Sequence, residues 1–83
     1  MKYRKKPVVV EAIQLEWDDS NIDEIRDFVG RDLLGLDSED KWFIETLEGK
    51  MRLCREAYVI KGVKGEFYPC DPEIFEQTYE KVD

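Results

Sequence analysis

The amino-acid sequence predicts an α+β domain with a small, mainly antiparallel sheet of about five to six strands. Three observations lead to this class. Short β-branched and aromatic stretches occur at intervals along the chain, turn-forming glycine and acidic residues separate them, and two stretches instead repeat apolar residues at helical spacing. One helix is expected after the first strand and a short helix near the C-terminal end. The length of 83 residues fits a single domain, residues 1–83.

The first two elements are a strand and a helix. A strand is expected over residues 8–15, because Pro7 fixes its entry and the valines that follow belong to a stretch that is largely apolar on both faces. A helix is expected over residues 21–29, where apolar side chains recur every three or four positions. Gly30 then stands where a left-handed residue commonly ends a helix.

Short strands and tight turns make up most of the remaining chain. Further strands are predicted at residues 33–36, 41–47, 51–54, 57–61 and 66–68. Hairpin turns are expected at Glu48-Gly49 and at 62–65, which has a glycine at each end. The last helix is expected over residues 72–80, with Asp71 as its N-cap. Ile74, Phe75 and Tyr79 would dock this helix, and all helices would pack on one face or one end of the sheet.

The composition excludes several kinds of active site. Histidine is absent, which removes the commonest general base and the usual partner of a nucleophilic serine or cysteine. The two cysteines, Cys54 and Cys70, cannot complete a tetrahedral zinc site by themselves, and we expect them to be reduced, buried thiols. The carboxylates show no sign of the burial that a general acid needs. The sequence therefore predicts a protein that is not an enzyme and has no metal or cofactor.

The charge balance narrows the choice of partner. There are 20 acidic and 13 basic residues, a formal net charge of −7. This argues against direct binding of nucleic acid, which requires a basic surface. No apolar run approaches the length of a membrane span and no signal peptide is evident, so a cytoplasmic protein without membrane contact is expected. A chain this short buries little surface by itself, which favours a homo-oligomer.

Two groups of residues are candidates for binding, and each has an ordinary structural interpretation. The first group would hold a small ligand with a phosphate and a base: Tyr3, Arg4, Lys61, Lys64 and Tyr68. The ordinary interpretation is a solvated terminus, a plain hairpin turn and a core tyrosine. The second group would present carboxylates to a protein: Asp18, Asp19, Asp23, Glu24 and Asp27. Here the ordinary interpretation is a solvated helix face.

The two tryptophans, Trp17 and Trp42, can be read in two ways. Each is expected in the core, where its large apolar area contributes most. If exposed, each would instead be an interface anchor.

Two blocks of the sequence carry a resemblance to a known group of proteins. Residues 1–14, MKYRKKPVVVEAIQ, and the block YVIKGVKGEFYPC that begins at Tyr58 and continues with DPEIFEQTYE resemble small proteins of phages and prophages. Members of that group usually have a Pro-Gly-Asp-Tyr turn before the second block. The matching positions here are Arg55, Glu56, Ala57 and Tyr58, so only the tyrosine is kept. The resemblance implies a setting in the cytoplasm of an infected bacterium, and it carries over no catalytic residue.

Taken together, the residues and the resemblance predict a non-enzymatic phage or prophage accessory protein that acts by binding. One hypothesis is counter-defence by sequestration of a small nucleotide-type ligand. The alternative is an acidic, DNA-mimic-like inhibitor that binds a host enzyme or regulator, and a structural or assembly role is a further alternative.

Overall fold

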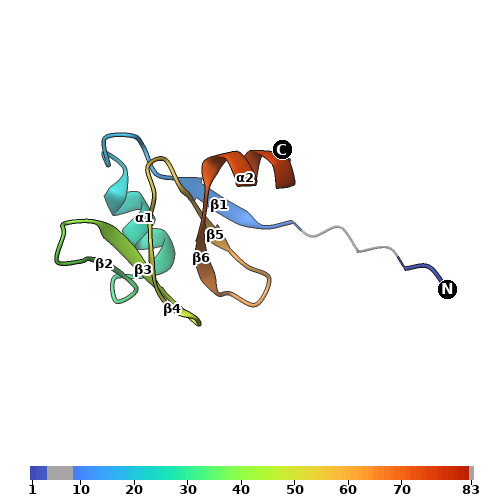
Figure 1. Ribbon diagram of the computed structural model, residues 1–83, viewed down its shortest axis with the longest axis horizontal. Helices are drawn as coiled ribbons and strands as arrows, with labels where there is room; N and C mark the ends of the chain where they lie inside the picture. Colours follow the sequence, from blue (N-terminus) through green and yellow to red (C-terminus); the bar gives the residue numbers. More distant parts are fainter. Residues whose placement is uncertain (4–8, 83) are drawn as a thin grey trace.

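The computed structural model describes residues 1–3 and 9–82 of the chain, and six strands and two helices lie within these ranges (Figure 1). In chain order the elements are β1 (Glu11–Gln14), α1 (Ile22–Val29), β2 (Leu34–Leu36), β3 (Trp42–Thr46), β4 (Gly49–Arg52), β5 (Tyr58–Lys61), β6 (Phe67–Cys70) and α2 (Pro72–Thr78). The α+β class and the antiparallel strand pairing are confirmed.

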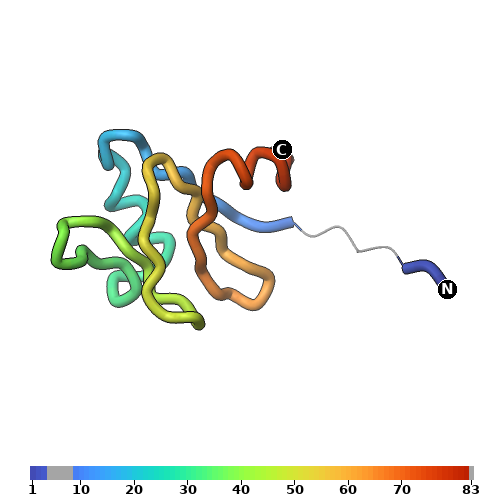
Figure 2. The backbone as a smooth tube through the Cα atoms, viewed as in Figure 1, coloured from blue at the N-terminus to red at the C-terminus, as the bar shows by residue number. Residues whose placement is uncertain are grey.

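The strands form two sheets, whereas the sequence pattern predicted one. The first sheet has the order β1-β5-β6 and the second the order β2-β3-β4. The chain passes between them after β4 (Figure 2). Leu53 is buried at this point, and a turn follows in which the Ala57 N–H donates to the Cys54 carbonyl. Alternation of apolar residues identifies a strand but not its partner, so the division into two sheets was not predictable from the pattern.

The main core lies between the two sheets and α1. Ile25 and Val29 of α1 meet Ile44 of β3 and Val59 of β5, and all four side chains are almost completely buried. The Phe28 ring of α1 makes an edge-to-face contact with Phe67 of β6, with ring centroids 5.3 Å apart. One short amphipathic helix therefore joins the two sheets through a common apolar cluster.

The second helix covers the opposite face of the first sheet. In the register of the sheet, Ile60 pairs with Tyr68 and Tyr58 pairs with Cys70, so these four side chains share one face and Val59 points to the other. The ring of Phe75 in α2 stacks on Tyr58, with centroids 3.8 Å apart. The two helices thus lie on different faces of this sheet, which corrects the expectation that they share one face or one end.

The helix ends also differ from the expectation in part. Asp71 caps α2 as predicted, accepting a hydrogen bond of 2.9 Å from the Glu73 N–H. At the start of α1, Asn21 makes no such cap; its side chain instead accepts from the Glu16 N–H and donates to the Gln14 carbonyl, both at 2.8 Å. Gly30 ends α1 with φ 98° and ψ 143°, a conformation that favours glycine but is not left-handed helical.

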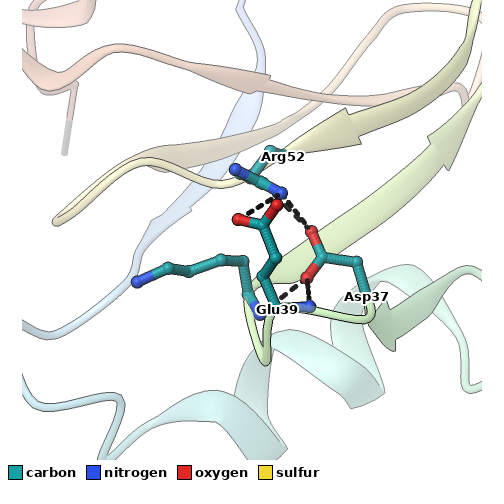
Figure 3. Close-up of polar contacts among 4 residues, drawn as sticks. Asp37, Glu39 and Arg52 are labelled. Atoms are coloured by element: carbon teal, nitrogen blue, oxygen red, sulfur yellow. Dashed lines mark hydrogen bonds and ion pairs between the residues drawn. The ribbon is translucent and has the colours of Figure 1, made fainter.

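The turn between β2 and β3 is tied to β4 by charged side chains (Figure 3). Asp37 accepts hydrogen bonds from the backbone N–H groups of Glu39 and Lys41, at 2.8 and 3.0 Å. Its other carboxylate oxygen accepts from the Arg52 guanidinium at 2.7 and 3.0 Å. These contacts lower the pKa of Asp37, chiefly through the Lys41 N–H and with a smaller contribution from Arg52.

Several side chains expected in the core lie elsewhere. Trp17 is 64% exposed and Ile74 is 58% exposed, because β1 ends before Trp17 and α2 contacts the sheet through Phe75 rather than Ile74. Cys54 is exposed, and Cys70 is half-buried. The first strand begins at Glu11 rather than at residue 8, which lies outside the described residues.

Trp42 is half-buried against the core, with the Arg26 guanidinium 5.8 Å from its ring centroid.

Candidate functional site

The residues predicted to hold a small ligand are spread over the described structure. Tyr3 is 89% exposed, and Arg4 lies outside the described residues. Lys61 ends β5 and Lys64 lies in the turn that follows, and both side chains are exposed. Tyr68 is half-buried in β6.

Lys61 and Tyr68 point to opposite faces of the first sheet. Lys61 pairs with Phe67 and Tyr68 with Ile60, and neighbouring positions of a strand alternate between faces. Lys61 also lies directly opposite Glu11 in the register between β5 and β1. Within one copy of the chain, the register therefore keeps Lys61 and Tyr68 apart.

The turn between β5 and β6 uses its own backbone donors. The Gly62 N–H donates to the Glu66 carbonyl at 2.7 Å, and the Gly65 N–H donates to the Gly62 carbonyl at 3.0 Å. Anion-binding glycine loops need these N–H groups to be free to point at the ligand. The turn has the geometry of a plain hairpin connection, so Lys64 and the neighbouring Lys61 contribute only exposed charges.

Tyr68 lies under α2, on the face that carries Ile60 and Tyr58. Burial, together with the neighbouring Tyr79 and the charge of Glu66, raises the pKa of Tyr68 to about 12. The same face carries a run of stacked rings, in which Phe75 lies 3.8 Å from Tyr58 and 4.8 Å from Tyr79. Tyr68 thus belongs to the packing between α2 and the sheet, which leaves only part of its ring for a ligand.

The acidic candidates, in contrast, lie together on the surface. Asp18 and Asp19 occupy the turn before α1, where Asp19 has a positive φ of 61°. Asp23, Glu24 and Asp27 lie on the outer side of α1, since positions three and four apart share a face. All five side chains are exposed. With Glu16 and Trp17 they form what we call the acidic surface.

Hydrogen bonds fix the turn in the acidic surface. The Ser20 N–H donates to the Asp18 carboxylate at 3.1 Å, and hydrogen bonding from Ser20 lowers the pKa of Asp18. The Asp19 N–H donates to the Glu16 carbonyl at 3.0 Å. Asp18 therefore stays ionised well into the acidic range, and its carboxylate is held in place rather than carried on a free loop.

The single cation within residues 16–27, Arg26, pairs with one carboxylate of the acidic surface. Arg26 forms an ion pair with Asp23 on the same helix and lies over the Trp42 ring. Its side chain is only 33% exposed, whereas that of Asp23 is 85% exposed. The outward-facing charges of the acidic surface are therefore almost entirely carboxylates.

Trp17 is the residue whose role the sequence left open. The chain leaves the first sheet after Gln14, where β1 ends, and Trp17 lies 64% exposed in the connection to α1. Its neighbours Glu16 and Asp18 are exposed as well. Aromatic side chains are enriched at protein interfaces, where they act as anchors.

Within residues 1–3 and 9–82, no group of three or more cysteine, aspartate or glutamate side chains is arranged to hold a metal ion. In the same ranges, no helix has both the length and the apolar character needed to cross a membrane.

Comparison with known proteins found no matching family model, no similar curated protein and no similar solved structure.

Proposed function

We propose that the chain is a non-enzymatic binding protein whose acidic surface docks on a basic site of a host protein. The observation that carries this proposal is the exposure of five carboxylates, with Glu16 and Trp17, on one turn and one helix face. A carboxylate array of this kind complements lysine and arginine side chains, which many proteins use to contact phosphates. The resemblance to phage and prophage proteins supports an accessory role, in which the occupied partner is an enzyme or regulator of the bacterium.

The carboxylates and Trp17 of the acidic surface contribute to binding in different ways. Exposed carboxylates accelerate and orient the encounter with a cationic partner, and their contribution is screened by salt. Trp17 supplies apolar area that charge alone does not, and such a ring is where binding energy concentrates once water is excluded. We therefore expect the carboxylates to control the association rate and Trp17 to control the dissociation rate.

Sequestration of a nucleotide-type ligand is the weaker alternative. Lys61 and Tyr68 lie on opposite faces of the sheet, and the glycine N–H groups of the turn are already used. A pocket that combined these residues would need side chains from a second copy of the chain. The proposal for protein binding needs no such assembly.

The test is affinity capture from a bacterial lysate with matched charge variants. Glu24→Lys with Asp27→Lys reverses two exposed charges and leaves the Asp23–Arg26 ion pair in place. Glu73→Lys with Glu80→Lys makes the same change of charge on exposed residues outside the acidic surface. Capture of a protein by the wild type and the control variant, with loss from the first variant and from Trp17→Ala, is the expected result.

Two outcomes would contradict the proposal. Equal capture by all variants would show that the acidic surface is not the contact. Retention of a small-mass adduct in native mass spectrometry, abolished by Lys64→Glu, would favour sequestration instead. Circular dichroism of each variant confirms that the fold is kept.

A further inference from the structure

A groove lies between the β3–β4 hairpin and β6, apart from the acidic surface. Its volume is about 310 Å³, at the lower end of the roughly 300–1,000 Å³ of ligand pockets. The hairpin turn reaches across to β6, so the groove joins the second sheet to the first (Figure 1). It shares no residue with the acidic surface.

The lining of the groove combines apolar and acidic side chains. Leu47 and Met51 come from the hairpin, and Phe67 and Pro69 come from β6. Leu47 is 93% exposed at the tip of the hairpin, which leaves its whole side chain available to a partner. Within residues 1–3 and 9–82, Glu48 and Glu66 are the charged residues of the lining, and no lysine or arginine accompanies them there.

Strand β6 is an edge strand of the first sheet, and the groove lies along its outer side. The Gly62 N–H donates to the Glu66 carbonyl, and hydrogen-bonded pairs then recur at every second position of the ladder. These pairs are Ile60 with Tyr68 and Tyr58 with Cys70. Phe67 and Pro69 lie between them in β6, so their backbone groups point outward. Pro69 has no N–H to offer there, which is a usual feature of an edge strand and discourages pairing with another strand. An occupant of the groove is therefore held by its side chains rather than by added strand pairing.

One acceptor of the groove lining is unsatisfied. The Oε2 atom of Glu66 is buried and, within the described residues, has no hydrogen-bond partner. Glu48 adds an exposed carboxylate at the rim. A cationic side chain that entered the groove would bring the opposite charge to these two carboxylates, and hydrogen bonds to charged groups are the stronger ones.

We propose that this groove binds a protein segment in which a lysine or arginine stands next to an apolar side chain. The apolar side chain rests on Leu47, Met51 and Pro69, and the cation faces Glu48 and Glu66. The proposal goes beyond the acidic surface, because it assigns a second contact with its own side-chain requirement and does not depend on Trp17 or α1.

The experiment titrates the ¹⁵N-labelled full chain with a capped leucyl-arginine dipeptide and follows backbone amide shifts by NMR. A capped leucyl-citrulline dipeptide is the matched probe, since it keeps the shape and removes the charge. We expect saturable shifts at residues 46–51 and 66–70, with binding about tenfold weaker for the citrulline probe. Glu48→Gln and Leu47→Ala should each weaken the arginine probe severalfold, while Glu73→Gln, an exposed change on α2, should not.

Three results would overturn the proposal. One is equal binding of the arginine and citrulline probes, and another is unchanged binding by Glu48→Gln and Leu47→Ala. The third is a set of shifts confined to residues 16–27, which would place the cation on the acidic surface. That last result would support the proposed function while removing the groove, so the two proposals can fail separately.

Discussion

The two sheets of this domain are assembled in different ways. Sheet β2-β3-β4 joins strands that follow one another directly, and its buried side chain Ile44 faces a single core. Sheet β1-β5-β6 joins residues 11–14 to residues 58–70 and buries side chains on both faces, Val59 toward the main core and Ile60 toward α2. A sheet made of consecutive strands can thus rely on one apolar face, whereas the sheet that joins distant segments is fixed by packing on both of its faces.

The largest expected effect is on the free energy of unfolding, and it should differ between the main core and the layer under α2. Ile44→Ala should lower the free energy of unfolding by an amount toward the upper end of about 2–5 kcal/mol, because the side chain is surrounded by two sheets and α1. Ile60→Ala should fall near the lower end, since α2 has no buried residue and can settle onto the smaller side chain. Urea unfolding of both variants measures the difference.

An equal cost for the two isoleucine variants would contradict the distinction between the two layers. A change in the urea dependence itself, rather than in the midpoint, would indicate a different unfolded or native ensemble and would call for another substitution.

The next effect concerns the turn between β5 and β6, where the side chain of Glu66 lies close to Gly62. A Cβ atom at Gly62 would overlap the Glu66 carboxylate, so Gly62→Ala requires that side chain to move. Because the carboxylate is the far end of a flexible side chain, we expect a loss of only about 1 kcal/mol in the free energy of unfolding. In a Glu66→Ala background the same change should cost much less, because the clashing group is gone. A cost that is the same in both backgrounds would show that space at Gly62 is not the cause.

The smallest effect is the pH dependence of the stability that Asp37 contributes in the second sheet. The pKa of Asp37 is lowered from 3.8 by the Lys41 N–H and by Arg52, so its ionised form stabilises the fold. This contribution is present above 3.8 and is lost as the pH falls through the lowered pKa of the folded state. Asp37→Asn should therefore be less stable than the wild type near neutral pH, and the gap should close in acid.

Urea unfolding at several pH values measures the closing of that gap. The effect is small because Arg52 and Glu39 are well exposed, and exposed ion pairs contribute little. A gap that persists unchanged in acid would show that the ionisation of Asp37 does not contribute to stability.

Much of the local structure could be predicted from the sequence. The strand over residues 42–46, the cap at Asp71 and the start of α2 at Pro72 follow from residue types and spacing that act within a few positions. The exposure of Asp23, Glu24 and Asp27 was also predictable, because helical periodicity assigns them to the side opposite Ile25 and Val29. These properties depend on neighbours in the chain and need no knowledge of distant contacts.

The sequence by itself determined the class of elements, their order and the surplus of carboxylates. Only the tertiary structure decided that the strands divide into two sheets, that Lys61 and Tyr68 face opposite ways, and that Trp17 lies at the surface. The physical reason is that strand pairing and register are set by burial and chain closure between distant segments. A shift of one position reverses every side chain of a strand, so a pattern of residue types cannot show which of them will meet.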